Sequence, residues 1–532
     1  MNLLAWCVMS GVCGLFWLLN KTSLRSGGKL TGGLLCAGAI LMSLPLMWSP
    51  SQAALDNALP RIVGVWAGLV FWFTLRQARF TTKQQQWLLT CLALASLIEA
   101  IVVLTELYGH VRWLPRIWLK MLDKYGRGGV GVFQQVNVTA SFLAMGLGST
   151  LLLLGVKSAT LPARRLEALR VFVLMSAAVV ISAVLTLIYS RVGWLGGILV
   201  TGGIYALLRS AHYRETSHRR LRLLLLPVVG VIAGLMMMKL SVMQALAAHE
   251  GSNHQRILTL YQTILYALQH PFLGSGAGTY EGMYQDYLAA LPGGNPGIEL
   301  MAHPHNELLY QFAEGGVVAL SGALLWCLLY LLRWRHARMP LQAGALLLML
   351  PFLLHTQLEY PLYYSVPHWL ALLLLLCLSE ESDERTLQAD TRTYKRVRIG
   401  MVALMVYGAI ISFQSFRAGQ VLDLFEATEL SQPEDIAGLN VPWVLRQRHD
   451  QDMTQLRLIR FRTDPDWFSL RKYTKENAIW MSVHAWPDFY RNQIAVLRYL
   501  HEEDQAAVWQ DKARRLFPWE KDFLPSSSPS QE

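Results

Sequence analysis

The sequence predicts an all-α polytopic membrane protein of about twelve transmembrane helices, followed by a soluble helical tail. The 532 residues are 53% hydrophobic and only 16% charged, whereas soluble proteins carry about 25% charged residues. Apolar runs close to membrane-spanning length recur as far as Phe416. After Ala418 the chain becomes charged and rich in Trp, and it contains no run that is long enough to span a membrane.

The apolar runs determine the expected number of spans. A spanning helix needs about 20 apolar residues, so the shorter runs must be completed by flanking residues. The runs occupy residues 3–19, 30–48, 62–75, 87–108, 138–156, 171–189, 192–208, 223–238, 317–332, 343–354, 369–378 and 399–416.

Basic residues predict the orientation of these spans. The net charge is +11, and the Lys and Arg residues are scattered over many short loops, which argues against a nucleic-acid partner. Cytoplasmic loops of membrane proteins are rich in Lys and Arg, and here basic loops alternate with others. The loops expected in the cytoplasm lie at residues 21–29, 76–83, 157–170, 209–222, 333–338 and 395–398. The remaining loops, the N-terminus and the tail are then expected on the outer face.

One long outer loop, residues 241–316, is predicted to carry the function. Between Lys239 and Arg333 the only Lys or Arg is Arg256, and the loop also holds a dense polar cluster at residues 303–306 (His-Pro-His-Asn). A long loop that is almost free of positive charge is typical of an exported segment. We therefore expect the loop to form a catalytic face on the outer side of the membrane.

A second outer loop, residues 108–131, breaks the charge rule. It contains five basic residues interspersed with Trp, Leu and Ile, a mixture that favours an amphipathic helix lying in the membrane interface. Basic residues on the outer side indicate either an anionic ligand or a contact with lipid headgroups. Arg127, near the end of this loop, is a candidate for binding such an anion.

Two more arginines and a glycine-rich turn are candidates for anion binding. Arg191 lies in a two-residue gap between apolar runs, where a charge is costly and is usually functional, although a long side chain can also extend to the membrane surface. Arg256 begins a stretch with helical periodicity that ends at Pro271. The glycines at residues 274, 276 and 278 permit either a close approach to a ligand or an ordinary sharp turn.

His303 and His305, with Asn306 beside them, are the candidate catalytic residues. The near-neutral pKa of histidine suits a general base at the membrane face. A metal site needs more ligands at suitable spacing, and the nearby Glu307 and Glu314 provide a poor set, so we expect no metal or other cofactor. The alternative interpretation is a structural histidine at the start of a helix.

Acidic residues interrupt the apolar stretches. Residues 355–361 (His-Thr-Gln-Leu-Glu-Tyr-Pro) lie on the predicted outer side, where Pro361 breaks the helix. Exposure of the Glu359 side chain to lipid would carry a high free-energy cost. Glu99 and Glu106 are expected to pair with basic residues rather than to take part in chemistry. The six Cys residues all lie in apolar runs and are predicted to be packing residues.

The tail is predicted to be helical. Residues 467–481, 488–500 and 505–517 have helical patterns, and residues 490–518 are similar to one helix-turn-helix repeat of the tetratricopeptide type. A module of this kind binds other proteins or peptides more readily than it performs chemistry.

Several of these motifs occur in an order that resembles the O-antigen ligase superfamily. The pattern comprises Arg127, residues 131–137 (Gly-Val-Phe-Gln-Gln-Val-Asn), residues 190–193 (Ser-Arg-x-Gly), Arg256, residues 270–276 (His-Pro-x-x-Gly-x-Gly), residues 303–306 and residues 315–316 (Gly-Gly). Within the superfamily, His-x-His-Asn, residues 358–361 (Leu-Glu-Tyr-Pro) and the repeat-like tail resemble the bacterial O-oligosaccharyltransferases that glycosylate pilins and other proteins. Val136 stands where that family usually has Pro.

This resemblance implies a membrane-embedded glycosyltransferase of the GT-C type that inverts the anomeric centre and needs no metal. Its donor would be a glycan on undecaprenyl diphosphate, presented on the periplasmic side of the bacterial inner membrane. Its partners would be this donor, membrane lipid and a protein acceptor such as a pilin, and the tail would also be periplasmic.

The resemblance also implies roles for individual residues. Arg191 and Arg256, with Arg127 as an auxiliary, would hold the diphosphate, because a guanidinium binds phosphate through several donors in a fixed fork. His305 would be the general base, supported by His303 and oriented by Asn306. The residues associated with donor or acceptor handling would be Gln135, Glu359 and Tyr360.

Three enzyme functions share this machinery: protein O-glycosylation, ligation of O-antigen to lipid A–core, and O-antigen polymerisation. A membrane transporter or lipid flippase is the alternative from another class, and it predicts repeated halves that the sequence does not show. The motifs divide the chain into N-terminal membrane helices with the amphipathic segment (1–130), a ligase-like catalytic membrane core including the loop at 241–316 (131–416), and a periplasmic helical tail (417–532).

Overall fold

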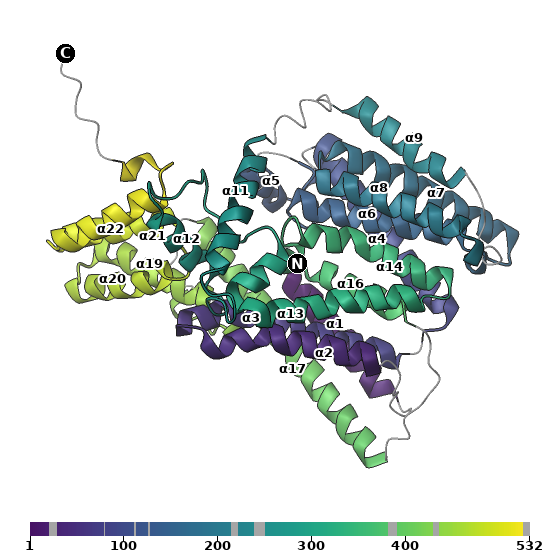
Figure 1. Cartoon of the computed structure of the whole chain (residues 1–532), viewed down its shortest axis with the longest axis horizontal. Helices are drawn as coiled ribbons and strands as arrows, with labels where there is room; N and C mark the ends of the chain where they lie inside the picture. The colour runs from purple at the N-terminus through teal and green to yellow at the C-terminus, as the bar shows by residue number, and fades with distance from the viewer. Residues whose placement is uncertain are drawn as a thin grey trace. The chain divides into compact units, whose positions relative to one another are not determined.

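The computed structural model is helical throughout the part of the chain that it describes, with no strand among those residues (Figure 1). This confirms the predicted all-α class. The described residues are 1–20, 29–78, 80–110, 113–125, 128–213, 222–238, 250–380, 391–428 and 436–524.

The predicted apolar runs all fall on helices. Among the described residues, nine helices are long and apolar enough to cross a membrane, which confirms a polytopic membrane protein. They are α1 (Asn2–Leu19), α2 (Lys29–Ser43) continued by η1 (Leu44–Trp48), α3 (Gln52–Gln77), α4 (Thr82–Tyr108), α6 (Val136–Gly155), α7 (Arg164–Leu187), α8 (Arg191–Arg209), α13 (Glu307–His336) and α17 (Thr391–Ala427). The other runs lie on shorter apolar helices, α9 (Arg222–Met237), α14 (Pro340–Thr356) and α16 (Val366–Leu378).

The remaining helices lie between these spans and in the tail. They are α5 (Arg116–Tyr125), η3 (Lys157–Ala159), η4 (Ala211–Tyr213), α11 (Glu250–Ala267), α12 (Tyr280–Ala290), α15 (Pro361–Tyr364), η5 (Trp443–Leu445), α19 (Arg446–Thr463), α20 (Trp467–Met481), α21 (Pro487–Tyr499), α22 (Glu503–Leu516) and η6 (Lys521–Phe523). The three helices predicted in the tail are therefore present, with ends within two residues of those expected.

The chain divides into two compact units, each made of segments that are not consecutive. Unit 1 comprises Met1–Leu35, Ala67–His249 and Trp326–Met405, and unit 2 comprises Cys36–Trp66, Glu250–Leu325 and Val406–Glu532. Unit 1 contains most of the apolar helices. Unit 2 contains residues 250–316 of the loop that is predicted to face outward, together with the tail.

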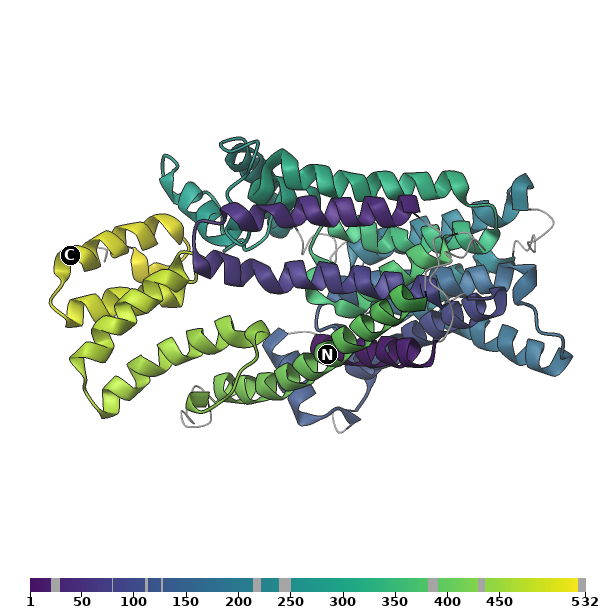
Figure 2. The same ribbon diagram turned by 90° about the horizontal axis from the view of Figure 1, so that it is seen from below.

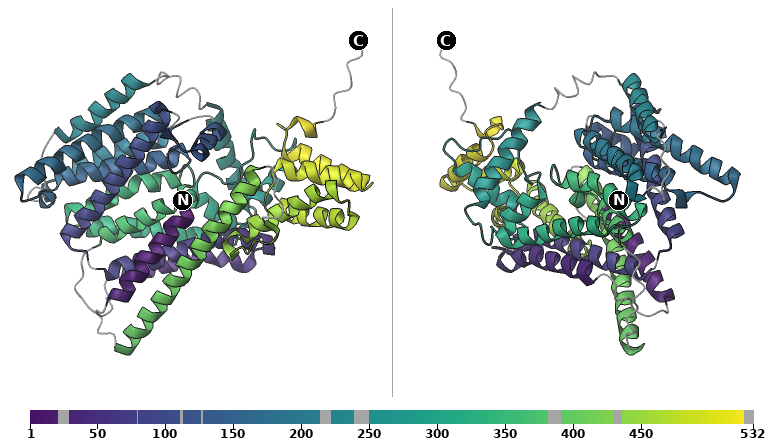
Figure 3. Two further views of the ribbon diagram at one scale, coloured as in Figure 1. Left: turned by 180° about the vertical axis from the view of Figure 1, so that it is seen from behind. Right: turned by 45° about the vertical axis from the view of Figure 1, so that its right-hand side comes forward.

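Helix α6 is the centre of unit 1, where it packs against α4, α7, α8 and α14 (Figures 1 and 3). Its residues from position 138 to its end are all buried. Small residues let the neighbouring helices approach closely: a Cβ atom at Gly146 would lie 2.0 Å from the Ser96 hydroxyl oxygen, and one at Gly148 would lie 2.4 Å from Val200.

In unit 2 the tail helices α19 to α22 pack each against the next, and α22 also packs against α12 (Figure 2). The contact with α12 is made by a buried apolar cluster that includes Ala289 of α12 together with Leu516 and Phe517 of the tail, both of which have no exposed surface. The tail is therefore anchored to the long loop that was predicted to carry the function.

The outer position of residues 241–316 can be tested by cysteine labelling. In a variant that lacks the six native Cys residues, we expect Glu299→Cys, at an exposed position of the loop, to react with a membrane-impermeant maleimide in spheroplasts. Ala163→Cys, which is exposed in a predicted cytoplasmic loop, is the matched control and should react only after lysis. The reverse pattern would invert the topology and contradict a periplasmic catalytic loop.

Candidate active site

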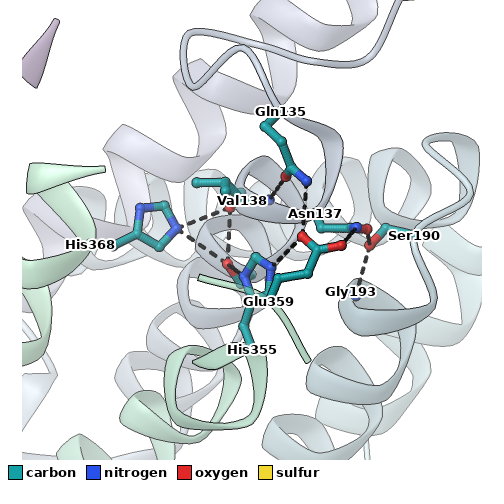
Figure 4. A network of polar contacts seen from close by, with 9 residues as sticks. Gln135, Asn137, Val138, Ser190, Gly193, His355, Glu359 and His368 are labelled. Carbon is teal, nitrogen blue, oxygen red and sulfur yellow. Dashed lines mark hydrogen bonds and ion pairs between the residues drawn. The ribbon is translucent and has the colours of Figure 1, made fainter. Parts of the chain in front are cut away.

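A buried carboxylate, Glu359, organises the N-terminal end of α6 in unit 1 (Figure 4). Its two oxygen atoms accept hydrogen bonds from Gln135 Nε2 at 2.9 Å and from Asn137 Nδ2 at 2.7 Å. Because Glu359 is only 6% exposed, its charge depends on such donors. The carboxylate also lies at the positive end of the α6 dipole, which stabilises a negative charge.

Gln135 is the N-cap residue of α6. Its Oε1 atom accepts a hydrogen bond from the Val138 N–H at 2.6 Å, while its Nε2 atom donates to Glu359. The preceding residue, Gln134, has a φ of 59°, a left-handed conformation that costs a non-glycine residue about 1–2 kcal/mol. This strained residue turns the chain sharply into the cap.

Two carboxylates of α4 hold the loop before Gln135. Glu106 Oε2 accepts hydrogen bonds from the N–H groups of Gly129 at 2.8 Å and Gly131 at 3.1 Å, and Glu99 Oε1 accepts from the Val132 N–H at 3.0 Å. Glu106 Oε1 also accepts from the Trp118 indole N–H at 2.8 Å, and Glu99 Oε1 from the Thr139 hydroxyl at 3.4 Å. In the described residues their partners are thus backbone N–H groups and uncharged side chains rather than the basic side chains that the sequence predicted. Gly131 is required here, because a Cβ atom would lie 1.9 Å from Glu99 Oε1.

Two buried histidines continue the network behind Glu359. The Nε2 atom of His355 lies 3.2 Å from Glu359 Oε2, and its Nδ1 atom lies 2.9 Å from the Ser141 hydroxyl oxygen. That oxygen lies 3.2 Å from His368 Nε2, and His368 Nδ1 lies 2.7 Å from the Ser365 hydroxyl oxygen. Both histidines and both serines have no exposed surface, so these polar groups satisfy one another inside the helix bundle.

The same network determines where α8 begins. The Ser190 hydroxyl donates to Asn137 Oδ1 at 2.7 Å and accepts from the Gly193 N–H at 3.1 Å, so it caps α8 and ties it to α6. Tyr189, with a φ of 55°, makes the tight turn from α7. Arg191 is the half-buried first residue of α8. The N-terminus of α8 therefore carries an arginine, a combination that suits an anion, while the Glu359 carboxylate occupies the N-terminus of α6.

In unit 2, His303 and His305 form a tight turn ahead of α13. The His303 Nδ1 atom accepts the His305 N–H at 3.1 Å, and the His303 ring packs on Tyr310 with 4.4 Å between centroids. His305 is half-buried and has a φ of 58°. Asn306 caps α13, because its Oδ1 atom accepts the Leu309 N–H at 2.9 Å. These contacts hold the His305 side chain on a rigid turn.

A buried ion pair supports this turn. Arg61 of α3 pairs with Glu314 of α13 at 2.5 Å, and its guanidinium carbon lies 4.7 Å from the centroid of the Tyr310 ring. The other oxygen of Glu314 accepts the N–H of Tyr280 at 3.1 Å. One carboxylate thus joins α3, α13 and the start of α12 around the histidine turn.

The turn depends on a neutral His303, because its Nδ1 atom accepts a hydrogen bond only while it is unprotonated. Burial, followed by the neighbouring His305 and Arg61, lowers the pKa of His303 well below its usual range. A proton therefore binds the unfolded chain more readily than the folded one. The stability that this group contributes is complete above about pH 6.5 and is lost as the pH falls further.

We therefore expect the thermal unfolding midpoint of the purified protein to fall between about pH 6.5 and about pH 5. His303→Asn should flatten this dependence, because an amide oxygen can take the place of Nδ1 and does not titrate. The measurement is unfolding in detergent over a series of pH values. His336→Asn, at an exposed position, is the control and should keep the wild-type slope. A wild-type slope in His303→Asn would contradict this account of the turn.

The glycine-rich turn of unit 2 packs closely against the backbone of neighbouring segments. The Gly276 N–H donates to the Glu314 carbonyl oxygen at 2.8 Å, and the Gly278 carbonyl accepts from Asn57 Nδ2 at 3.0 Å. A Cβ atom at Gly278, where φ is +79°, would lie 2.0 Å from the Ala54 carbonyl oxygen. Of the two interpretations of these glycines, the described residues therefore favour the structural turn.

Helix α13 is interrupted at Gly316, whose φ of 57° and ψ of −154° are not helical. The Val317 N–H donates to the Pro271 carbonyl at 2.9 Å, and a Cβ atom at Gly316 would lie 2.3 Å from the Phe272 carbonyl oxygen. The short half-helix after Asn306 therefore has its own direction, separate from that of the span that follows.

Two family models match the chain. Residues 176–324 match the model described as O-antigen ligase, and residues 344–528 match the model described as virulence factor membrane-bound polymerase, C-terminal. The matches support the O-antigen ligase superfamily. No curated protein matches the chain.

The O-antigen ligase match includes Arg191, Arg256 and residues 303–306, and the polymerase match includes residues 355–361 and most of the tail. Both segments thus contain residues of the candidate site. The superfamily comprises membrane glycan ligases and polymerases, which agrees with an enzyme rather than a transporter.

Within each unit the structure brings some of the predicted site residues together. Gln135 and Glu359 share a hydrogen bond in unit 1, and residues 303–306 form one turn in unit 2. Arg256 is half-buried on α11. Tyr360 precedes α15 and stacks on Tyr364, with 5.1 Å between ring centroids. Arg127 lies outside the described residues.

Several residues that the structure connects to the site carry no distinctive signal of their own in the sequence. Asn137, Ser190 and His355 stand inside the motifs but were not identified individually. His355 and Glu359 have the i, i+4 spacing that places two side chains on one helix face, a signal that could have paired them. Arg61, at the predicted outer end of a span, could have been noticed because basic residues are rare on that side.

Proposed function

We propose that the protein is an O-oligosaccharyltransferase. It transfers a glycan from undecaprenyl diphosphate to Ser or Thr hydroxyls of periplasmic proteins such as pilins, with inversion and without a metal. The observation that carries the proposal is Arg191 at the N-terminus of α8, since a helix N-terminus with an arginine suits a diphosphate. The family matches support the broader class, a membrane glycan ligase or polymerase.

In the proposed reaction the acceptor oxygen attacks the anomeric carbon of the glycan, and the bond from that carbon to the diphosphate oxygen breaks. His305 takes the hydroxyl proton, and the diphosphate leaves with the electron pair. Arg191 and Arg256 stabilise the departing charge through forked hydrogen bonds. Attack from the side opposite the leaving group inverts the anomeric centre.

The catalytic loop and the tail are proposed to face the periplasm, and the spans to lie in the inner membrane. A lipid-linked donor remains in the bilayer, so an enzyme that uses it needs its site at the membrane surface. The predicted outer ends of the spans carry Gln135, Arg191 and Glu359, which agrees with this placement.

A reconstituted reaction tests the proposal. Purified protein is incubated with an undecaprenyl-diphosphate glycan and a pilin-type acceptor, and glycosylated acceptor is detected on a gel. An acceptor whose Ser and Thr residues are replaced by Ala is the control and should remain unmodified. Transfer of the glycan to lipid A–core, with none to protein, would contradict the proposal and establish an O-antigen ligase.

A polymerase is the second candidate, because the match over residues 344–528 is to a family described as a membrane-bound polymerase. A polymerase joins one lipid-linked glycan to another and needs no protein. Incubation with the donor alone therefore separates the two functions. A ladder of longer lipid-linked glycans would favour the polymerase, and an unchanged donor would favour the transferase.

Contacts of the tail support a role for it in choosing the acceptor. Lys512 of α22 pairs with Asp286 of α12 at 2.8 Å, and Arg515 Nε donates to the Ala289 carbonyl at 2.7 Å. Asn295 Nδ2 in the long loop donates to the Leu516 carbonyl at 2.9 Å. The tail is thus fastened to the segment that is proposed to be catalytic, within reach of a protein that approaches it.

Deleting residues 505–532 is expected to lower protein glycosylation while the enzyme still binds undecaprenyl diphosphate. The measurements are acceptor glycosylation on a gel and the rise in thermal unfolding midpoint caused by the carrier lipid. The deletion also removes fully buried Leu516 and Phe517, so a surface variant is needed beside it.

The surface variant combines Phe468→Ser with Val508→Ser, at side chains that are 75% and 68% exposed. We expect it to fold normally and to raise the KM for the acceptor without changing the KM for the donor. Unchanged acceptor use in both variants would leave the tail with a structural role only.

A further inference from the structure

The first turn of α8 is connected to the carboxylate of Glu359, which is distant in sequence, through the side chains of Asn137 and Ser190 (Figure 4). Glu359 accepts from Asn137 at 2.7 Å, Asn137 accepts from Ser190 at 2.7 Å, and Ser190 accepts from the Gly193 N–H at 3.1 Å. Three separate segments of the chain meet in these contacts. Arg191 directly follows the last side chain of the series.

Glu359 and Gln135 have their polar atoms engaged within the protein. Both oxygen atoms of Glu359 accept hydrogen bonds, and one of them also lies 3.2 Å from His355 Nε2. Gln135 uses its oxygen to cap α6 and its nitrogen to reach Glu359. Groups that are used in this way hold structure more readily than they bind a sugar or a phosphate.

We propose that Glu359 is a positioning residue for Arg191, which it orients through Asn137 and Ser190. On this proposal the site requires a single negative charge, which can be carried by residue 359 or by residue 137. This inference rests on the proposed function, in which Arg191 holds the diphosphate. It replaces the expectation that Glu359 contacts the substrate.

Hydrogen-bond geometry provides a charge-swap test. In Glu359→Gln, the new amide nitrogen faces a donor, either Asn137 Nδ2 or Gln135 Nε2, whichever way the amide is turned. In Asn137→Asp, two carboxylates face each other across 2.7 Å. In the double variant, the amide of residue 359 donates to the carboxylate of residue 137 and its oxygen still accepts from Gln135. The Ser190 hydroxyl still has an acceptor at position 137.

We expect each single variant to lose about tenfold to hundredfold in glycan transfer, because a hydrogen bond to a buried charge is lost or opposed. The double variant N137D/E359Q should recover to within about threefold of the wild type, since its hydrogen bonds and its charge are restored. Glu167→Gln, the same chemical change on α7 where Glu167 pairs with Arg170, is the matched control and should transfer normally. A double variant that is as poor as its worse single variant would overturn the proposal.

A second measurement separates positioning of Arg191 from general stability. The inhibition constant of undecaprenyl diphosphate should rise in Glu359→Gln, whereas the KM for the protein acceptor should stay close to the wild-type value. In an Arg191→Ala background, adding Glu359→Gln should cause no further rise in this inhibition constant. Additive effects of the two changes would show that Glu359 does not act through Arg191.

Failure of the proposed function would be seen in the wild type, which would then transfer no glycan to protein. Failure of this inference would be seen only in the variants, with an active wild type and no recovery in the double variant. Thermal unfolding of the wild type, the two single variants and the double variant identifies any variant that is merely unfolded.

Discussion

His305→Ala is expected to abolish detectable glycan transfer. His305 is the proposed general base, and loss of a positioned base usually costs about 10²–10⁴ in rate. His303→Ala should leave more residual activity, because His303 holds the turn through its Nδ1 atom rather than taking the proton. The assay is glycosylated acceptor on a gel, with membrane levels of the enzyme matched.

The backbone at His305 calls for a matched variant, because Ala tolerates a φ of 58° poorly. His305→Asn removes the base and keeps a residue type that adopts the left-handed conformation readily. It should be as inactive as His305→Ala and should unfold at the wild-type temperature. Loss of activity with a chelator and rescue by zinc would instead indicate a metal ligand. Wild-type transfer by His305→Asn would remove this residue from the mechanism.

Arg191→Lys and Arg256→Lys are each expected to lose about tenfold to hundredfold in transfer, while the protein still inserts and folds. A planar guanidinium holds a diphosphate through a fixed fork, and an ammonium is only a point charge. The measurement is the initial transfer rate at several donor concentrations. It separates weaker donor binding from a slower chemical step.

Arg209→Lys is the control for these changes. It lies at the other end of α8, where its guanidinium contacts the Tyr205 hydroxyl at 3.1 Å, and it should transfer normally. Near-normal transfer by both Arg191→Lys and Arg256→Lys would place the phosphate elsewhere, with Arg127 as the next candidate.

The helices were predictable because each depends on local composition. A run of apolar residues identifies a buried or membrane helix wherever it packs, and the helix predicted at residues 467–481 is α20 (Trp467–Met481). The His-x-His-Asn motif could also be recognised in the sequence, because its residues are adjacent and chemically distinctive. For the same reason Asn306 at the start of a helix could be expected as a cap.

The contacts between distant residues were not predictable. Asn137 and Glu359 are separated by 222 positions, and no local pattern relates them. Glu99 and Glu106 accept from the uncharged side chains of Thr139 and Trp118 and from backbone N–H groups. Every residue except proline carries a backbone N–H, so the sequence does not reveal which of these groups is the partner. The ion pair of Arg61 and Glu314 likewise spans 253 positions. A single sequence indicates which side chains are costly to bury, but their partners depend on the fold.

The left-handed backbone at Gln134, Tyr189 and His305 constrains how this chain can diverge. Each of these residues stands at or next to a site residue, and a β-branched side chain is poorly accommodated at a positive φ. Gly and Asn fit there at little cost, whereas Val, Ile and Thr do not. Few residue types can therefore replace these three residues, even where the side chain touches no substrate. Exposed positions beside these turns carry no such backbone restriction, so we expect the turns to vary less than the residues around them.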